Sequence, residues 1–355
     1  MQKVCAIIYL FCLTSRCFAF SEPVAVFDGI DSSALSISPD GEWVVSGGAI
    51  PLDNRNPARI LDPRPGLLNV WNVSTKKLSF TRKDTGIRPN SIALSPDGTL
   101  LAVGYVPDGF ELSSKTGVLR VYSFPTMKEL LVDSSSECRS LCFSPDSKLL
   151  FYEATKESGD GEFVLWNIEA KKAKLTLSRE DCGFRSDSSL SSSSVAWAPN
   201  GDTLVIGDVK GVIRAIRLSD CQTTALSPHK SNVRCLAISK DNQIVASVGT
   251  DGMLNLSSLD SKQLLISIKA HNPYAMQVAL LPSGSFVATS GMRFQNNDRR
   301  HEWAIWEVKS GRRAFAVDAH SCPVTCLSMT VDGRWLATGA GDGTVKIWNI
   351  PEKYR

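Results

Sequence analysis

The sequence has few of the residues from which catalytic and metal sites are built. Its 355 residues include only 4 His, and no group of His, Cys or carboxylate residues has the spacing of a metal site. It contains no Gly-x-Ser-x-Gly motif, no phosphate-binding loop and no His-Glu-x-x-His motif. We therefore expect a non-catalytic protein without a cofactor or a metal.

A large excess of charge of either sign is also missing. The 39 Lys and Arg residues face 36 Asp and Glu residues, for a net charge of +3, and no basic run or acidic tail occurs. Nucleic acid and anionic membrane surfaces are therefore not expected as partners. The 43% of hydrophobic residues, with 25 Gly and 17 Pro, suit a folded β protein with many turns.

The first twenty residues differ from the rest of the chain. They carry Lys3, an apolar core from Val4 to Leu13, and the small residues Cys17 and Ala19. This pattern resembles a secretory signal peptide cleaved after Ala19, and its core is too short to span a bilayer. We predict a signal in residues 1–19 and an exported protein, periplasmic or extracellular. An uncleaved N-terminal membrane anchor is the alternative.

Seven of the ten cysteines lie beyond this segment. Three of them occupy positions where other repeats place small residues, which indicates packing. The other four, in predicted loops or strand ends, allow one disulfide of open pairing in an oxidising compartment: Cys138, Cys182, Cys221 and Cys322.

One tight turn recurs seven times between residue 38 and residue 333. In most copies Pro presets the backbone and Asp or Asn with Gly completes the turn. The turns are Ser38-Pro39-Asp40-Gly41, Ser95-Pro96-Asp97-Gly98, Ser144-Pro145-Asp146-Ser147, Ala198-Pro199-Asn200-Gly201, Ser239-Lys240-Asp241-Asn242, Leu281-Pro282-Ser283-Gly284 and Thr330-Val331-Asp332-Gly333. A period near forty residues with added loops is typical of a β-propeller.

The strand before each turn has a small residue between two large apolar ones. The small residues are Ser36, Ala93, Cys142, Ala196, Ala237, Ala279 and Ser328. Such a strand fits the crowded axis of a propeller, and three further apolar runs follow in each repeat. The seventh repeat lacks its fourth run, and Val24–Phe27 can supply it. We predict an all-β, seven-bladed propeller over residues 20–355, with four-stranded antiparallel blades and the ring closed by residues 24–27.

These repeats resemble the WD-repeat (WD40) family of β-propellers from Glu22 to Ile350. Blades of that family often carry a buried His, Ser/Thr, Asp and Trp that hydrogen-bond to one another. The resemblance assigns all four to the seventh blade: His320, Thr338, Asp342 and Trp348. The fifth blade has His229, Ser247 and Asp251 with Ser257 in place of Trp, and the sixth has His271, Thr289 and Trp306 with Arg300 in place of Asp. The first four blades are degenerate.

Four repeats have insertions between their second and third strands: Gly47–Gly66, Gly104–Gly117, Ala154–Gly161 and Gly291–Glu302. They open on the same side of neighbouring blades, which we call the insertion face. Loops held by a rigid scaffold often carry function, and Arg and aromatic residues are favoured at binding hot spots. We predict that a protein or peptide binds there through Arg55, Arg59, Arg64, Tyr105, Phe110, Phe294, Arg299, Arg300 and His301.

The alternative is a small-ligand-binding or hydrolytic propeller with its site at the mouth of the central channel. Its candidate residues are Arg88, Arg139, Arg234 and Tyr274. The sequence leaves the oligomeric state open.

Overall fold

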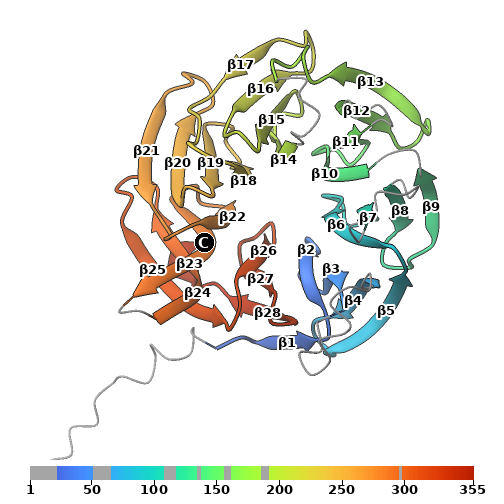
Figure 1. The fold of residues 1–355 in the computed structure, drawn as a ribbon, viewed down its shortest axis with the longest axis horizontal. Helices are drawn as coiled ribbons and strands as arrows, with labels where there is room; N and C mark the ends of the chain where they lie inside the picture. The colour runs from blue at the N-terminus through green and yellow to red at the C-terminus, as the bar shows by residue number, and fades with distance from the viewer. Residues whose placement is uncertain are drawn as a thin grey trace, which may run out of the picture.

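The fold is a ring of seven antiparallel sheets. The computed structural model describes residues 22–50, 65–107, 117–133, 137–155, 161–184, 192–295 and 298–355. In these ranges 28 strands form seven four-stranded sheets, which surround a central axis as blades (Figure 1). The predicted seven-bladed propeller is confirmed.

The first four blades follow one another along the chain. Blade 1 contains β2 (Asp31–Ile37), β3 (Trp43–Ala49), β4 (Gly66–Asn72) and β5 (Lys77–Asp84). Blade 2 contains β6 (Ile87–Leu94), β7 (Leu100–Pro107), β8 (Val118–Ser123) and β9 (Glu129–Asp133). Blade 3 contains β10 (Glu137–Phe143), β11 (Leu149–Thr155), β12 (Gly161–Asn167) and β13 (Lys172–Ser178). Blade 4 contains β14 (Ser192–Trp197), β15 (Thr203–Asp208), β16 (Ile213–Arg217) and β17 (Thr223–Ala225).

The last three blades complete the ring. Blade 5 contains β18 (Val233–Ile238), β19 (Ile244–Gly249), β20 (Met253–Ser258) and β21 (Leu264–Lys269). Blade 6 contains β22 (Ala275–Leu280), β23 (Phe286–Gln295), β24 (Asp298–Glu307) and β25 (Arg313–His320). Blade 7 contains β26 (Val324–Met329), β27 (Trp335–Ala340), β28 (Thr344–Asn349) and, from the other end of the chain, β1 (Ala25–Asp28).

Strand β1 closes the ring between the two ends of the fold. It pairs antiparallel with β28, from Ala25 opposite Ile347 to Asp28 opposite Thr344. Phe27 of β1 is buried and stacks on Trp71 of blade 1, with ring centroids 5.1 Å apart. The N-terminal strand therefore completes blade 7 and also contacts the next blade, as the repeat count predicted.

The recurring turn has a shared set of hydrogen bonds. In the first copy, Ser38 Oγ donates to Asp40 Oδ1 at 2.5 Å and accepts from the Trp43 amide at 2.9 Å. Gly41 has φ of +76°, and a Cβ there would lie 2.6 Å from the Trp335 ring of blade 7. Gly thus serves both the backbone conformation and the close approach of the neighbouring blade.

The hydrophobic core lies mainly between blades. Second strands such as β3 and β7 are buried at consecutive positions, because both faces of a blade are covered by its neighbours. Trp303 of blade 6 and Trp348 of blade 7 are fully buried and pack with ring centroids 5.8 Å apart. After β28, a 3-10 helix at Glu352–Tyr354 places the buried Tyr354 ring 5.1 Å from Phe286 of blade 6.

All four predicted insertions begin as strand rather than loop, because β3, β7, β11 and β23 each continue into them. β7 continues through Tyr105, which pairs with Val118, and β23 and β24 form a ten-residue hairpin in which Met292 pairs with His301. The prediction of a loop over Gly291–Glu302 is therefore wrong for the described residues, because cross-strand pairing continues beyond the usual strand end. Within the described ranges no helix has the length and apolar character needed to cross a membrane. The predicted signal, residues 1–19, lies outside those ranges.

Candidate functional site

The polar set of blade 7 joins four elements of the chain. His320 Nε2 lies 2.9 Å from Thr338 Oγ1, which also accepts from Trp348 Nε1 at 2.8 Å. His320 Nδ1 lies 3.1 Å from Asp342 Oδ2, in the turn between β27 and β28. Burial opposes ionisation of Asp342, but hydrogen bonds from His320 and Thr344 hold the pKa of this carboxyl well below its usual value. His320 ends β25 of blade 6 and the other three residues belong to blade 7, so the set joins the two blades and is structural.

Blade 5 has the same arrangement without Trp. His229 bonds Ser247 Oγ at 2.9 Å through Nε2 and Asp251 at 3.0 Å through Nδ1. Asp251 also accepts from the amides of Lys230 and Met253. Ser257 is buried at the Trp position, as the sequence predicted.

Blade 6 obtains its acidic residue from a position that the sequence did not indicate. His271 Nε2 lies 2.8 Å from Thr289 Oγ1, and the Nδ1 atom lies 3.4 Å from Glu302 Oε1. The other carboxylate oxygen of Glu302 accepts from Arg313 Nη2 at 2.5 Å. Burial opposes ionisation of Glu302, but His271 and Arg313 lower the pKa of its carboxyl, whereas burial lowers the pKa of His271. Arg300 points elsewhere, to an ion pair with Asp318.

Other polar contacts hold blades 1 and 3. In blade 1, Trp71 Nε1 donates to Ser46 Oγ at 3.2 Å. In blade 3, Glu153 and Arg179 form an almost completely buried ion pair, and the guanidinium lies over the rings of Phe163 and Phe184. Blade 1 therefore keeps the Ser and Trp contact of the family set, whereas blade 3 has a buried ion pair of its own.

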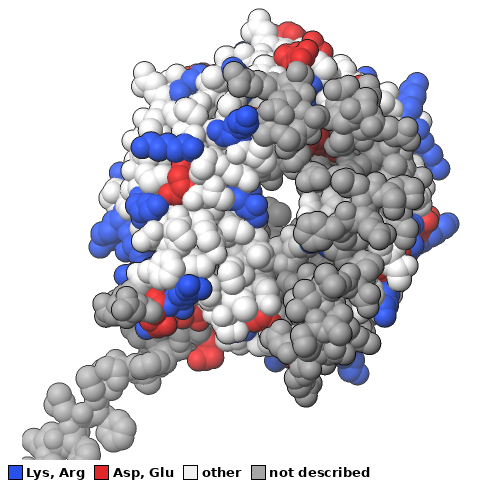
Figure 2. Space-filling view, viewed as in Figure 1, with Lys and Arg blue, Asp and Glu red and all other residues white. Residues whose placement is uncertain are grey.

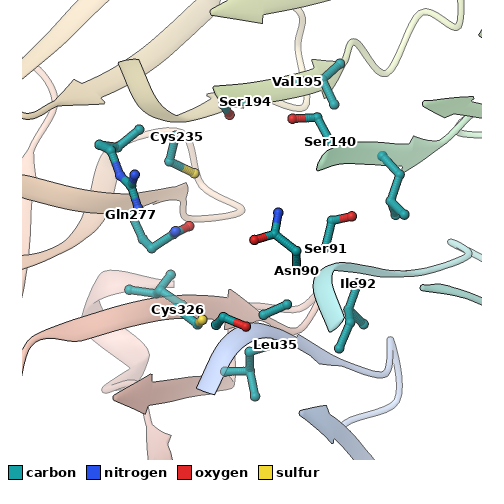
Figure 3. Close-up of a pocket in the computed structure, with 15 residues that line it drawn as sticks. Leu35, Asn90, Ser91, Ile92, Ser140, Ser194, Val195, Cys235, Gln277 and Cys326 are labelled. Carbon is teal, nitrogen blue, oxygen red and sulfur yellow. The ribbon is translucent and has the colours of Figure 1, made fainter. Parts of the chain in front are cut away.

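The central channel is lined by one inner strand from each blade. Figure 3 shows Asn90, Ser91, Ser140, Ser194 and Gln277 around a common space. Its volume is about 180 Å³, bounded by 15 residues of the inner strands. In the part of the chain that the structure describes, this lining contains no His, Asp or Glu, so it lacks the side chains most used for general acid-base catalysis.

Polar groups near the channel connect most pairs of neighbouring blades among the described residues. The hydrogen bonds run from Ser33 Oγ to Pro89 O at 2.7 Å, from Ser91 Oγ to Cys138 O at 3.2 Å, from the Leu236 amide to Ser194 Oγ at 2.9 Å, from Gln277 Nε2 to Thr325 O at 2.9 Å and from Thr325 Oγ1 to Ser32 O at 2.6 Å. Many polar groups of the channel wall therefore form hydrogen bonds between blades.

Of the predicted channel-mouth residues, Arg234 lines the channel cavity, and its Nε atom is buried without a hydrogen-bond partner among the described residues. Arg88 and Tyr274 are half-buried and are not part of the described lining. Arg139 lies on β10, and its side chain is outside the described part of the structure. The structure therefore places one of the four candidates in the cavity.

The predicted partner-binding residues fall into three groups. Arg55, Arg59, Arg64 and Phe110 lie outside the described residues. Tyr105 and His301 are buried, at 0% and 8% exposure. Tyr105 cannot be part of an exposed face, because β7 carries it into the contact between blades 1 and 2. Phe294, Arg299 and Arg300 are exposed near the end of the β23–β24 hairpin.

The hairpin end combines an exposed aromatic ring with cations. Phe294 is 44% exposed, and the Arg299 guanidinium lies 5.6 Å from its ring centroid. Arg300 pairs with Asp318 and, at 3.5 Å, with Asp298. Large exposed apolar side chains next to Arg are typical of binding hot spots.

All seven described cysteines are free thiols, so the disulfide allowed by the sequence does not form in the structure. Cys138 lies on β10 and is fully buried, and burial raises the pKa of its thiol. Burial likewise raises the pKa of Cys182 to about 12. Such thiols have little thiolate character, which argues for packing over reactivity.

Seven four-stranded blades around a channel, with His–Ser/Thr–Asp contacts in blades 5 and 7, define a β-propeller of the WD-repeat type. Consistent with this, the family described as "WD domain, G-beta repeat" matches residues 311–349. The "Anaphase-promoting complex subunit 4 WD40 domain" matches residues 195–281.

Among curated proteins, the chain is 31% identical over 153 residues to "Small ribosomal subunit protein RACK1y" of Oryza sativa subsp. japonica, covering 43% of this chain and 41% of the relative. It is 25% identical over 235 residues to "Transducin beta-like protein 2" of Homo sapiens, with coverages of 63% and 49%. It is 23% identical over 331 residues to "Protein groucho" of Drosophila melanogaster, with coverages of 89% and 38%. The matches thus span less than half of each relative.

A solved structure has the same fold. A chain in the "Crystal Structure of Mitotic Checkpoint Complex" superposes with a TM-score of 0.72 at 19% identity, covering 94% of this chain and 97% of that chain. At this identity the likeness shows the architecture alone.

Proposed function

We propose that the protein is a non-catalytic interaction platform that binds a protein or peptide on its insertion face. The observation that carries this proposal is the long β23–β24 hairpin, whose end presents exposed Phe294 beneath Arg299. A rigid hairpin with a pre-positioned aromatic side chain loses little conformational entropy on binding. The described channel lining contains no His, Asp or Glu, which supports binding over general acid-base catalysis in the channel.

Capture from native extract tests this proposal with two baits. Both contain residues 20–355, which include every described strand. In the second bait, an Asn-Gly turn replaces Arg293–Arg300 and joins Met292 to His301, which are paired across the hairpin. A matched control, Lys309→Ala with Arg312→Ala, changes exposed residues at the opposite end of the same blade.

A partner retained by the wild-type and control baits but lost by the shortened hairpin supports the proposal. Equal capture by all three baits would place the site elsewhere on the molecule. If no bait captures a specific partner, the small-ligand alternative is the next to test.

Arg234 is the observation that favours this alternative. A guanidinium whose Nε is buried without a hydrogen-bond partner among the described residues, in a polar cavity, suits a small anion. However, about 180 Å³ is below the roughly 300–1,000 Å³ of most small-molecule pockets. Native mass spectrometry of purified protein tests it: a ligand bound to the wild type and lost in Arg234→Ala would replace the platform proposal.

We also propose that the protein is exported, with a signal cleaved after Ala19. The support is the sequence pattern of Lys3, the apolar core Val4–Leu13 and the small residues Cys17 and Ala19. An intact mass that begins at Phe20 is the expected result for protein from its native source. A mass that retains residues 1–19 would favour the anchored alternative.

A further inference from the structure

The carboxylates of the insertion face on blades 5 to 7 are already engaged. His229 and backbone amides bind Asp251, and Arg300 binds both Asp298 and Asp318. Arg313 of the same blade binds Glu302, and His320 at the end of β25 binds Asp342. Each of these acidic groups therefore already has a partner in its cation, imidazole or amide neighbours.

Five cations on the same face have no carboxylate partner within the described ranges. We call them the basic arc: Lys230, Arg234, Lys269, Arg293 and Arg299. Lys230 precedes β18, Lys269 ends β21, and Arg293 and Arg299 lie near the hairpin end. Lys269 Nζ donates to a backbone carbonyl, that of Asp251, at 2.6 Å. Figure 2 shows Lys and Arg side chains spread over the side of the molecule formed by β18–β25.

An apolar contact point lies within this positive surface. Phe294 is exposed under the Arg299 guanidinium, and blades 5 and 6 are neighbours through β18 and β22. A ligand that crosses from Lys269 to the hairpin would meet cations on both sides of this ring. Matching such a surface requires negative charge with an apolar side chain among the charges.

We propose that the basic arc selects an acidic peptide segment that carries an apolar side chain, a proposal that rests on the insertion face being the binding face. Charge complementarity speeds the encounter and suppresses partners with basic segments. The near-neutral chain as a whole favours a peptide over nucleic acid, which usually requires a strongly basic domain.

A selection with a random displayed peptide library tests this proposal and does not require the natural partner. The targets are the wild-type chain and the double variant Lys269→Glu with Arg299→Glu. The matched control, Lys172→Glu with Lys174→Glu, reverses two exposed charges on the outer strand of blade 3. If the first double variant unfolds, Lys230→Ser with Arg293→Ser replaces it. Affinities of the selected peptides are measured by fluorescence anisotropy at low and high salt.

The expected result is enrichment of acidic peptides with an apolar residue on the wild type and the control. These peptides should bind the basic-arc variant at least about tenfold more weakly and lose affinity at high salt. Enrichment of neutral or basic peptides that depend on the hairpin would overturn the acidic selectivity but leave the binding face intact. Enrichment of no face-dependent peptide, or displacement of the peptides by a single-stranded oligonucleotide that binds more tightly, would overturn the proposal.

Discussion

At the residue scale, blade 6 shows how a repeat can lose one member of a polar set and recover its chemistry from another position. Glu302 lies on β24 opposite Gly291, and a Cβ at Gly291 would come within 2.4 Å of the His271 ring. The glycine therefore lets His271 approach the sheet where Glu302 can reach it. The result is a His–Glu–Arg group around a buried carboxylate rather than a His–Asp pair.

We expect Glu302→Ala to destabilise the fold by about 3 kcal/mol, because it leaves Arg313 and His271 without their buried carboxylate. Asp298→Asn, at an exposed surface pair, should cost less than about 1 kcal/mol. Urea denaturation measures both variants. Equal, small effects would contradict the assignment of Glu302 to the acidic position.

The buried His271 predicts a pH effect on stability. Burial lowers the pKa of His271 in the folded state, so below about pH 6.5 the unfolded chain binds a proton that the folded chain does not. The free energy of unfolding should therefore decrease as the pH falls from 7.5 to 5.5, by at most about 1.4 kcal/mol per pH unit for this group. Urea denaturation at several pH values should show a smaller slope for His271→Gln. An unchanged slope would exclude His271 as its source.

The sequence predicted the residues of the blade 7 set correctly, because that blade keeps the family spacing. The sequence did not predict Glu302 as the acidic residue of blade 6, because the ten-residue hairpin shifts this residue along β24. The register of an extended hairpin is not visible in a repeat alignment. The prediction failed for Tyr105 because an insertion that follows a Gly looks like a loop, whereas pairing of Tyr105 with Val118 continues the strand.

At the element scale, the short helix Glu352–Tyr354 joins blade 7 to blade 6. Tyr354 packs on Phe286 and Phe315, and its hydroxyl donates to Ala314 O at 3.2 Å. The predicted repeats end at Ile350, and the sequence predicts no role for the residues after it. Three residues form too short a helix for periodicity to reveal.

We expect Tyr354→Ala to destabilise the protein by about 3 kcal/mol through lost aromatic packing between blades. Glu352→Ala, at an exposed position of the same helix, serves as the control and should change stability by less than about 0.5 kcal/mol. Thermal unfolding followed by tryptophan fluorescence measures both. A Tyr354→Ala protein as stable as the control would show that the helix does not hold the two blades together.

At the scale of the whole molecule, closure depends on a strand that comes from the opposite end of the chain. Val345 and Ile347 of β28 are fully buried in the cluster that contains Phe27. Counting apolar runs in the repeats was enough to predict this closure, because one missing strand in blade 7 matched one extra strand before blade 1.

A chain that begins at Gly29 lacks β1 and should expose the edge of β28. We expect lower stability and association that increases with protein concentration, since unpaired edges with apolar neighbours pair between molecules. Light scattering after size-exclusion chromatography, with a chain that begins at Glu22 as the control, measures this. A truncated protein that stays monomeric and equally stable would show that β1 is dispensable.

The hydrogen bonds around the channel limit how the number of repeats can change during evolution. Hydrogen bonds join most of the inner strands to their successors, and Thr325 of the last blade bonds Ser32 of the first. An open solenoid can gain or lose one repeat at an end with little effect on the others. In this closed ring, recombination that removes one repeat would break the contacts of the lost blade with both of its neighbours. It would also change the angle between every remaining pair of neighbouring blades. Variation should therefore accumulate as insertions between strands, while the number of repeats stays fixed.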